Sequence, residues 1–69
     1  MNKLVDARGL SCPQPVMLAQ KAIEEGVFPI EVLVDTVTSR ENVRRMAEFR
    51  KCKVEITQDG DEFRLVLSK

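Results

Sequence analysis

The segment Ser11-Cys12-Pro13-Gln14-Pro15 marks the start of a helix, and the rest of the fold follows outward from it. Proline is tolerated in the first turn of a helix, because the amide hydrogen that it lacks would have no partner within the helix there. An apolar stretch with the spacing of one buried helix face follows. We therefore predict a helix over residues 13–25, with Cys12 at or next to its N-cap and with these residues on its apolar side: Val16, Leu18, Ala19, Ala22 and Ile23.

The flanking residues predict how this helix begins and ends. Residues 4–7 form a short extended segment, and residues 8–10 a turn. Gly26 follows the helix at the position where a left-handed residue commonly ends one.

The second half of the chain predicts one more helix and three strands. Residues 30–35, 53–57 and 63–67 show the alternation of half-buried strands. Thr38 and Glu41 have the spacing of a capping box, which predicts the start of a helix that runs to about residue 50. Asp59-Gly60 predicts a hairpin between the last two strands. The core side of the second helix is expected to contain Val43, Met46, Ala47 and Phe49.

The predicted element order is β-α-β-α-β-β. We expect an α+β fold (an α/β two-layer sandwich), with two helices packed on one face of a four-stranded mixed sheet. The other face would meet solvent or a partner, with Leu33 and Val66 among its residues. Residues 1–69 are expected to form a single domain.

Charge and hydropathy exclude several classes of function. Eleven basic and eleven acidic side chains give a formal net charge of zero, so no overall field attracts nucleic acid or an anionic membrane. No apolar run approaches the roughly eighteen residues of a membrane span, and residues 1–6 lack the apolar part of a signal peptide. We expect a cytoplasmic protein with no membrane partner and no direct binding of nucleic acid.

The sequence contains two cysteines and no histidine. A Cys/His zinc cluster and a Cys–His nucleophile pair therefore cannot form within one chain, and we expect neither a metal nor a cofactor. Cys12 and Cys52 are too far apart for a C-x-x-C redox motif. A reducing compartment favours two free thiols, while a single disulfide stays open as an alternative.

Cys12 has the surroundings of a reactive thiol. The positive end of a helix dipole favours thiolate over thiol, and the amides of Gln14 and Val16 are candidate donors to a sulfur anion. Arg8 is a hypothetical source of positive charge beside it. Without a histidine or another evident base, the thiol suits a carrier rather than a stand-alone enzyme. The residues expected to support the Cys12 turn are Arg8, Gly9, Pro13, Gln14 and Pro15.

The segment Asp6-Ala7-Arg8-Gly9-Leu10-Ser11-Cys12-Pro13-Gln14-Pro15-Val16, followed by Lys21-Ala22, resembles the signature of the TusA/SirA/YedF-like sulfur-carrier proteins. Residues 32–35, 41–43 and 47–48 are most similar to the YedF-type branch. The resemblance covers essentially the whole chain, and its most specific part is the CPxP motif that begins at Cys12.

The resemblance implies a carrier cysteine, Cys12, that holds sulfur as a persulfide. A cysteine desulfurase or another sulfurtransferase would load this sulfur. A downstream acceptor protein would receive it for tRNA thiolation or other sulfur or selenium metabolism. YedF-type relatives can carry a second, C-terminal domain, which we do not expect within these 69 residues. Sulfur-relay members commonly have a basic residue where this chain has Gln20, which weakens the expectation of an identical desulfurase partner.

Two alternatives stay open at this point. Cys12 can be a purely structural cysteine at a helix start, and Cys52 is expected to fill the core. The whole domain can also be a non-catalytic regulatory or RNA-binding module of the same fold. The neutral charge and the small number of aromatic residues, three phenylalanines, argue against RNA binding.

Overall fold

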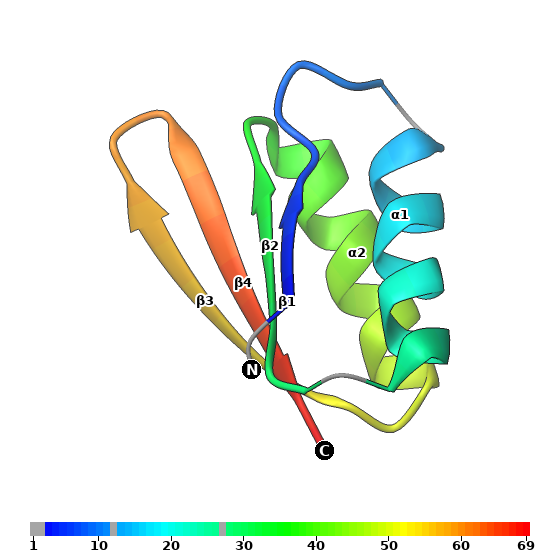
Figure 1. The fold of residues 1–69 in the computed structure, drawn as a ribbon. Helices are drawn as coiled ribbons and strands as arrows, with labels where there is room; N and C mark the ends of the chain where they lie inside the picture. Colours follow the sequence, from blue (N-terminus) through cyan, green and yellow to red (C-terminus); the bar gives the residue numbers. More distant parts are fainter. Residues whose placement is uncertain (1–2, 12, 27) are drawn as a thin grey trace.

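The protein folds as two helices on one face of a four-stranded sheet (Figure 1), in a computed structural model that describes residues 3–11, 13–26 and 28–69. The predicted element order and the α+β two-layer fold are confirmed. The elements are β1 (Lys3–Asp6), α1 (Gln14–Glu25), β2 (Ile30–Val34), α2 (Val37–Phe49), β3 (Lys53–Asp59) and β4 (Glu62–Ser68).

The sheet has the strand order β1-β2-β4-β3 and is mixed, as predicted. β1 and β2 are parallel, whereas β4 is antiparallel to both of its neighbours. Each of the two parallel strands is followed by a helix, so α1 and α2 both begin where β1 and β2 end. We call this end of the molecule, at the carboxyl ends of β1 and β2, the loop end. The β3–β4 hairpin lies there too, since Phe63 of β4 pairs with Val34 of β2.

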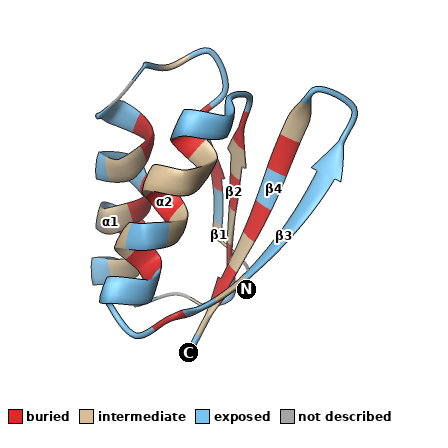
Figure 2. Ribbon diagram, turned by 180° about the vertical axis from the view of Figure 1, so that it is seen from behind, coloured by how far each residue is buried: buried red, intermediate tan, exposed pale blue. Residues whose placement is uncertain are grey.

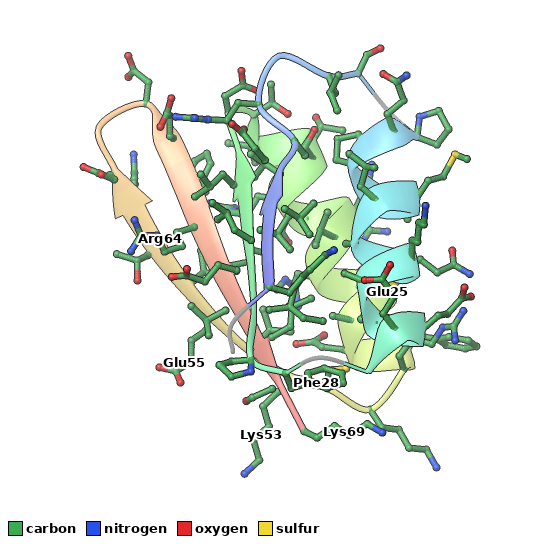
Figure 3. The ribbon with its side chains drawn as sticks, in the orientation of Figure 1. Glu25, Phe28, Lys53, Glu55, Arg64 and Lys69 are labelled. Atoms are coloured by element: carbon green, nitrogen blue, oxygen red, sulfur yellow. The ribbon has the colours of Figure 1, made fainter. Side chains whose placement is uncertain are left out.

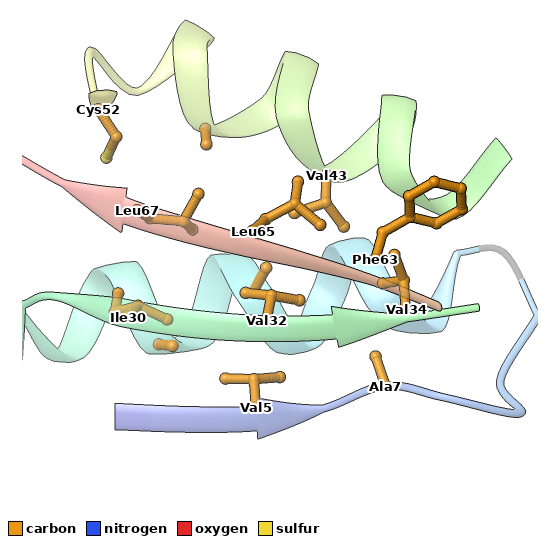
Figure 4. Close-up of a cluster of buried hydrophobic side chains, with 13 residues drawn as sticks. Val5, Ala7, Ile30, Val32, Val34, Val43, Cys52, Phe63, Leu65 and Leu67 are labelled. Atoms are coloured by element: carbon orange, nitrogen blue, oxygen red, sulfur yellow. The ribbon is translucent and has the colours of Figure 1, made fainter. Parts of the chain in front are cut away.

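The core lies between the sheet and the helices and is built from alternate strand residues (Figure 4). Valine, isoleucine and leucine side chains of the central strands point toward the helices, where alanines let the helix backbones approach closely. Figure 2 shows this alternation along β2 and β4. The buried apolar residues are Val5, Ala7, Ala19, Ala22, Ile30, Val32, Val34, Val43, Ala47, Cys52, Phe63, Leu65 and Leu67.

The helices leave one edge and one face of the sheet open. Every residue of β3 except the half-buried Val54 is exposed. On the face away from the helices, Leu33 and Val66 are half-buried, as predicted for this face. Figure 3 shows Glu55 and Arg64 extending from the same side of the sheet.

The end of α1 fits the signal predicted from the sequence, whereas the start of α2 uses a different capping residue from the predicted one. Gly26 ends α1 with a φ of 75° and donates its N–H to the Ile23 carbonyl, as predicted. The predicted capping box of Thr38 and Glu41 does not form. Thr36 is the N-cap of α2, and its hydroxyl accepts a hydrogen bond of 3.0 Å from the Ser39 amide.

The predicted core faces of the two helices need two corrections. Phe49 was expected in the core but is 85% exposed, because it lies off the helix face that carries the buried Val43 and Ala47. Leu18 is 39% exposed rather than buried. Pro15, which was not assigned to the core, is fully buried instead.

Candidate functional site

The loop that follows β1 carries the predicted site and is tied down by charged contacts. The Arg8 side chain donates to both oxygens of the Asp6 carboxylate, from Nε and Nη2, each at 2.9 Å. Its Nη1 also contacts the Glu62 carboxylate at 3.2 Å. Two carboxylates thus surround one guanidinium. Arg8 therefore links β1 to the start of β4. The hypothesis that it lends positive charge to the Cys12 sulfur stays a prediction, since Cys12 lies outside the described residues.

The same contacts set the ionisation of Asp6. The side-chain and backbone hydrogen bonds from Arg8 lower the pKa of the Asp6 carboxyl from 3.8 to about 2. The hydrogen bonds that the guanidinium donates to Asp6 and Glu62 raise the pKa of Arg8. A lowered pKa means that the contact favours the folded state above pH 3.8 and that this contribution disappears as the pH falls through about 2. The pair is therefore fully ionised at neutral pH.

An NMR titration of the Asp6 carboxyl carbon is expected to show a midpoint near 2. In Arg8→Ala the midpoint is expected to return toward 3.8, because both hydrogen bonds from the guanidinium are lost. An Asp6 midpoint that is the same in both proteins would show that Arg8 does not hold this carboxylate in solution.

Gly9 holds the middle of the loop against the end of β2. Its N–H donates to the Asp35 carboxylate at 2.8 Å, and its φ of 76° lies in the left-handed region that favours glycine. Asp35 is the first residue after β2, so a carboxylate at a strand end positions a loop that is 26 residues away in sequence.

A backbone hydrogen bond joins Ser11 and Gln14, which lie on either side of Cys12 in the sequence. The Gln14 amide donates to the Ser11 carbonyl at 2.9 Å, so it is not the free donor to a sulfur anion that we predicted from the sequence. The Val16 amide stays a prediction in that role. Pro13 is the N-cap of α1 and is exposed, while Pro15 anchors the first turn in the core. Cys12 lies outside the described residues.

Two hollows flank the loop. One, of about 400 Å³, lies between the loop and the start of α2 and is lined by Gly9, Leu10, Ser11, Asp35, Thr36, Thr38 and Ser39. The other, of about 290 Å³, is largely apolar and is lined by Leu10, Gln14, Met17 and Leu18. Met17 is 61% exposed. The residues on either side of Cys12 therefore border one surface rich in hydroxyl groups and one apolar surface.

The second cysteine lies far from this loop. Cys52 is a free thiol that is 6% exposed, which confirms the prediction of a core position and excludes it as half of a disulfide here. In Figure 4 it lies near Leu67 and Ile30, at the opposite end of the core from Ala7 and Phe63.

The structure brings together the ends of three segments that the sequence analysis treated separately. Arg8, Gly9, Pro13, Gln14 and Pro15 lie in or beside the loop, and their support of the Cys12 turn stays a prediction. Sequence reasoning missed Asp35 and Glu62, whose only signal was an acidic side chain at a strand end. Within the described ranges no group of histidine, cysteine, aspartate and glutamate side chains could hold a metal ion. No helix there is long and apolar enough to cross a membrane.

Comparisons with known proteins agree with this geometry. The family described as sulfurtransferase TusA matches residues 3–69. A protein of Methanocaldococcus jannaschii named "Putative sulfur carrier protein MJ0990" is 34% identical over 97% of this chain and 93% of its own length. The crystal structure of a SirA-like protein from Desulfitobacterium hafniense has a TM-score of 0.85 and 34% identity, over 97% of this chain and 95% of that one. The chain therefore belongs to the TusA family and is a protein of the sulfur-carrier and sulfurtransferase type.

Proposed function

We propose that the protein accepts and donates persulfide sulfur through Cys12. The observation that carries this proposal is the loop itself. Gly9 is held by Asp35 on one side of Cys12, and Ser11 is bonded to Gln14 across it. These fixed positions on both sides of residue 12 support the proposal, because a group that must meet a partner enzyme reacts faster when little conformational freedom is lost in the encounter.

The transfer needs no redox cofactor. The Cys12 thiolate attacks the outer sulfur of a persulfide on the donor. The donor's sulfur–sulfur bond breaks, and the donor cysteine leaves as a thiolate, so that a new persulfide stands on Cys12. Delivery to an acceptor is the same step in reverse. Each step exchanges one sulfur–sulfur bond for another, and no electrons are gained or lost overall.

The surroundings support a thiolate that is not consumed within the chain. Cys12 directly precedes the N-cap of α1, and α2 also begins at the loop end, so the positive ends of two helix dipoles face this region. Cys52 is buried at the opposite end of the core and is therefore no rival thiol. The residues thus suit a carrier that works between proteins.

The direct test is mass spectrometry of the protein after incubation with a cysteine desulfurase and cysteine. We expect a gain of the mass of one sulfur atom, located by fragmentation on the peptide that contains Cys12 and reversed by a thiol reductant. Cysteine persulfide as a low-molecular-weight donor tests the thiol independently of any protein partner. Absence of the added sulfur with both donors would contradict the proposal.

Asp35→Ala is expected to slow the loading of Cys12 without unfolding the protein. The exposed carboxylate contributes little to packing, but its loss frees Gly9 and misplaces the loop, which costs reactions about ten- to a hundredfold in rate when reacting groups shift by roughly 1 Å. Single-turnover loading from a desulfurase measures this rate. Asp61→Ala is the matched control, because Asp61 is an exposed acidic residue of the nearby hairpin that makes no hydrogen bond or ion pair with the described residues of the loop. Equal rates for the two variants would contradict the role of Asp35.

The pathway belongs to the proposal as well. Sulfur delivery to tRNA thiolation or to another sulfur- or selenium-using pathway, through a desulfurase or sulfurtransferase and a downstream acceptor, extends the family assignment. The YedF-type branch and the cytoplasmic location stay predictions. Parallel loading assays with cysteine and selenocysteine, followed by transfer to candidate acceptors, distinguish the two elements.

The alternative of an RNA-binding module has one new observation in its favour. Phe49 is an exposed aromatic residue, and Arg50 and Lys51 follow it. One strongly exposed aromatic side chain, on a chain of zero net charge, offers little surface on which nucleic-acid bases could stack. Salt-dependent RNA binding that survives in Cys12→Ala and is lost in Phe49→Ala would favour this alternative.

A further inference from the structure

The first strand of the sheet has one unpaired edge. Among the residues that the structure describes, β1 pairs only with β2, and no strand lies on its other side (Figure 1). The amides of Lys3 and Ala7 donate to Pro29 and Leu33, across the β1–β2 side. Because successive residues of a strand direct their N–H and C=O groups to opposite sides, those of Leu4 and Asp6 point away from β2. The free edge therefore offers two donors and two acceptors to another strand.

A groove runs beside this edge. It has a volume of about 290 Å³ and lies between β1 and α1, with Lys3, Leu4, Val5, Asp6, Leu18, Lys21 and Ala22 along it. Leu18 also lines the apolar hollow at the start of α1. The edge, the groove and the hollow thus form one continuous surface that leads to the loop end, where Cys12 is located in the chain.

The charges along the groove favour an acidic occupant. The Asp6 carboxylate already accepts hydrogen bonds from Arg8, and Lys3 forms an ion pair of 3.1 Å with Glu25. Lys21 is exposed and forms no ion pair with any residue in the described ranges. The charge left for a partner is therefore positive, beside the exposed side chain of Leu18.

We propose that this edge docks an extended segment of the protein that exchanges sulfur with Cys12, which adds to the sheet as a fifth strand beside β1. The proposal rests on the proposed function. Main-chain hydrogen bonds to Leu4 and Asp6 hold the segment, apolar residues at alternate positions enter the groove, and an acidic residue meets Lys21. A strand bound along β1 points directly toward the loop end, so it brings the partner's reactive sulfur to the carrier cysteine.

A peptide titration followed by NMR tests this docking without a known partner. The probe is a blocked peptide of alternating valine and threonine, with a glutamate at one valine position. We expect shifts at the amides of Leu4, Asp6 and Lys21, and at least about tenfold slower hydrogen exchange at Leu4 and Asp6. The same peptide N-methylated at alternate residues, which cannot pair with the edge, is expected to produce neither effect.

Leu4→Pro is the matching change in the protein. It removes the outward N–H without removing a bond to β2, and proline is tolerated in edge strands. Peptide affinity is expected to fall at least about tenfold in Leu4→Pro and much less in Leu4→Ala, which keeps the N–H. Lys21→Glu is expected to lower the affinity for the glutamate-containing peptide and to raise the affinity for a peptide with lysine in place of that glutamate.

Several outcomes would overturn the proposal. These are equal binding of the N-methylated peptide, shifts confined to Leu33 and Val66 on the open face, and no shifts at all. Concentration-dependent dimers in sedimentation that disappear in Leu4→Pro would assign the edge to a second copy instead. Loading from cysteine persulfide does not need the edge, so Leu4→Pro should load at the wild-type rate. A wild-type protein that fails to load contradicts the proposed function, while the peptide titration still tests the edge.

Discussion

Cys12→Ala is expected to abolish sulfur loading, whereas Cys52→Ala retains it. The proposed transfer needs a thiolate nucleophile, and alanine offers none. Cys52 cannot replace it, because that thiol is 6% exposed and lies at the opposite end of the core. Mass spectrometry after incubation with a desulfurase and cysteine measures both variants under the same conditions.

Stability measurements separate this chemical effect from misfolding. Cys52→Ala removes a buried side chain and is expected to cost about 1 kcal/mol of unfolding free energy. The variant that still loads sulfur is therefore expected to be the less stable of the two. Urea unfolding of both proteins checks this order. Persulfide sulfur found on Cys12→Ala, or lost from a folded Cys52→Ala, would refute the assignment of the carrier thiol.

Leu65→Ala is expected to leave the protein largely unfolded at room temperature. Leu65 is fully buried on β4, which is a central strand of the sheet, and it lies between Val32 of β2 and Ile56 of β3. Leucine-to-alanine changes in a core cost about 2–5 kcal/mol. A single core in a chain of this size rarely supplies more than about 3–5 kcal/mol, so the loss is comparable to the whole stability.

Ile56→Ala is the matched control for this prediction. Ile56 is the cross-strand partner of Leu65 on β3, but it is 38% exposed because the helices do not cover that edge. We expect a loss of about 1 kcal/mol or less. Circular dichroism with urea unfolding measures both variants, and a Leu65→Ala protein as stable as Ile56→Ala would show that the core is not concentrated at β4.

Local patterns were enough to predict the elements. Alternating residues at 30–35 and 63–67, the prolines at the start of α1 and Gly26 at its end each act within a few residues, and the structure places all of them close to the predicted bounds. The N-cap of α2 was harder. Thr36 and Thr38 both precede an apolar helix face, and only the backbone leaving β2 decides that the first of them caps the helix.

The contacts that hold the loop could not be predicted in the same way. Asp35 reaches Gly9, and Glu62 reaches Arg8 across 54 residues of sequence. These contacts exist because β1 and β2 are neighbours and the β3–β4 hairpin ends at the same place, and the strand order was not evident from any local pattern. The exposure of Phe49 also depends on packing, since the sheet buries only the α2 face that carries Ser39, Val43 and Ala47.

The register of the strands also determines where a label or an anchor can be attached without covering the loop that carries Cys12. Lys3 pairs with Ile30, and Leu67 is the partner of Ile30 on its other side, so the first and last described strands begin and finish together, away from the loop end. A fluorescent label or a surface anchor attached after Lys69 would leave the carrier loop facing the solution. An anchor attached before Lys3 would leave the same loop exposed but would stand beside the groove of β1. Immobilisation through one terminus or the other therefore offers two versions of the same carrier that differ in access to the groove.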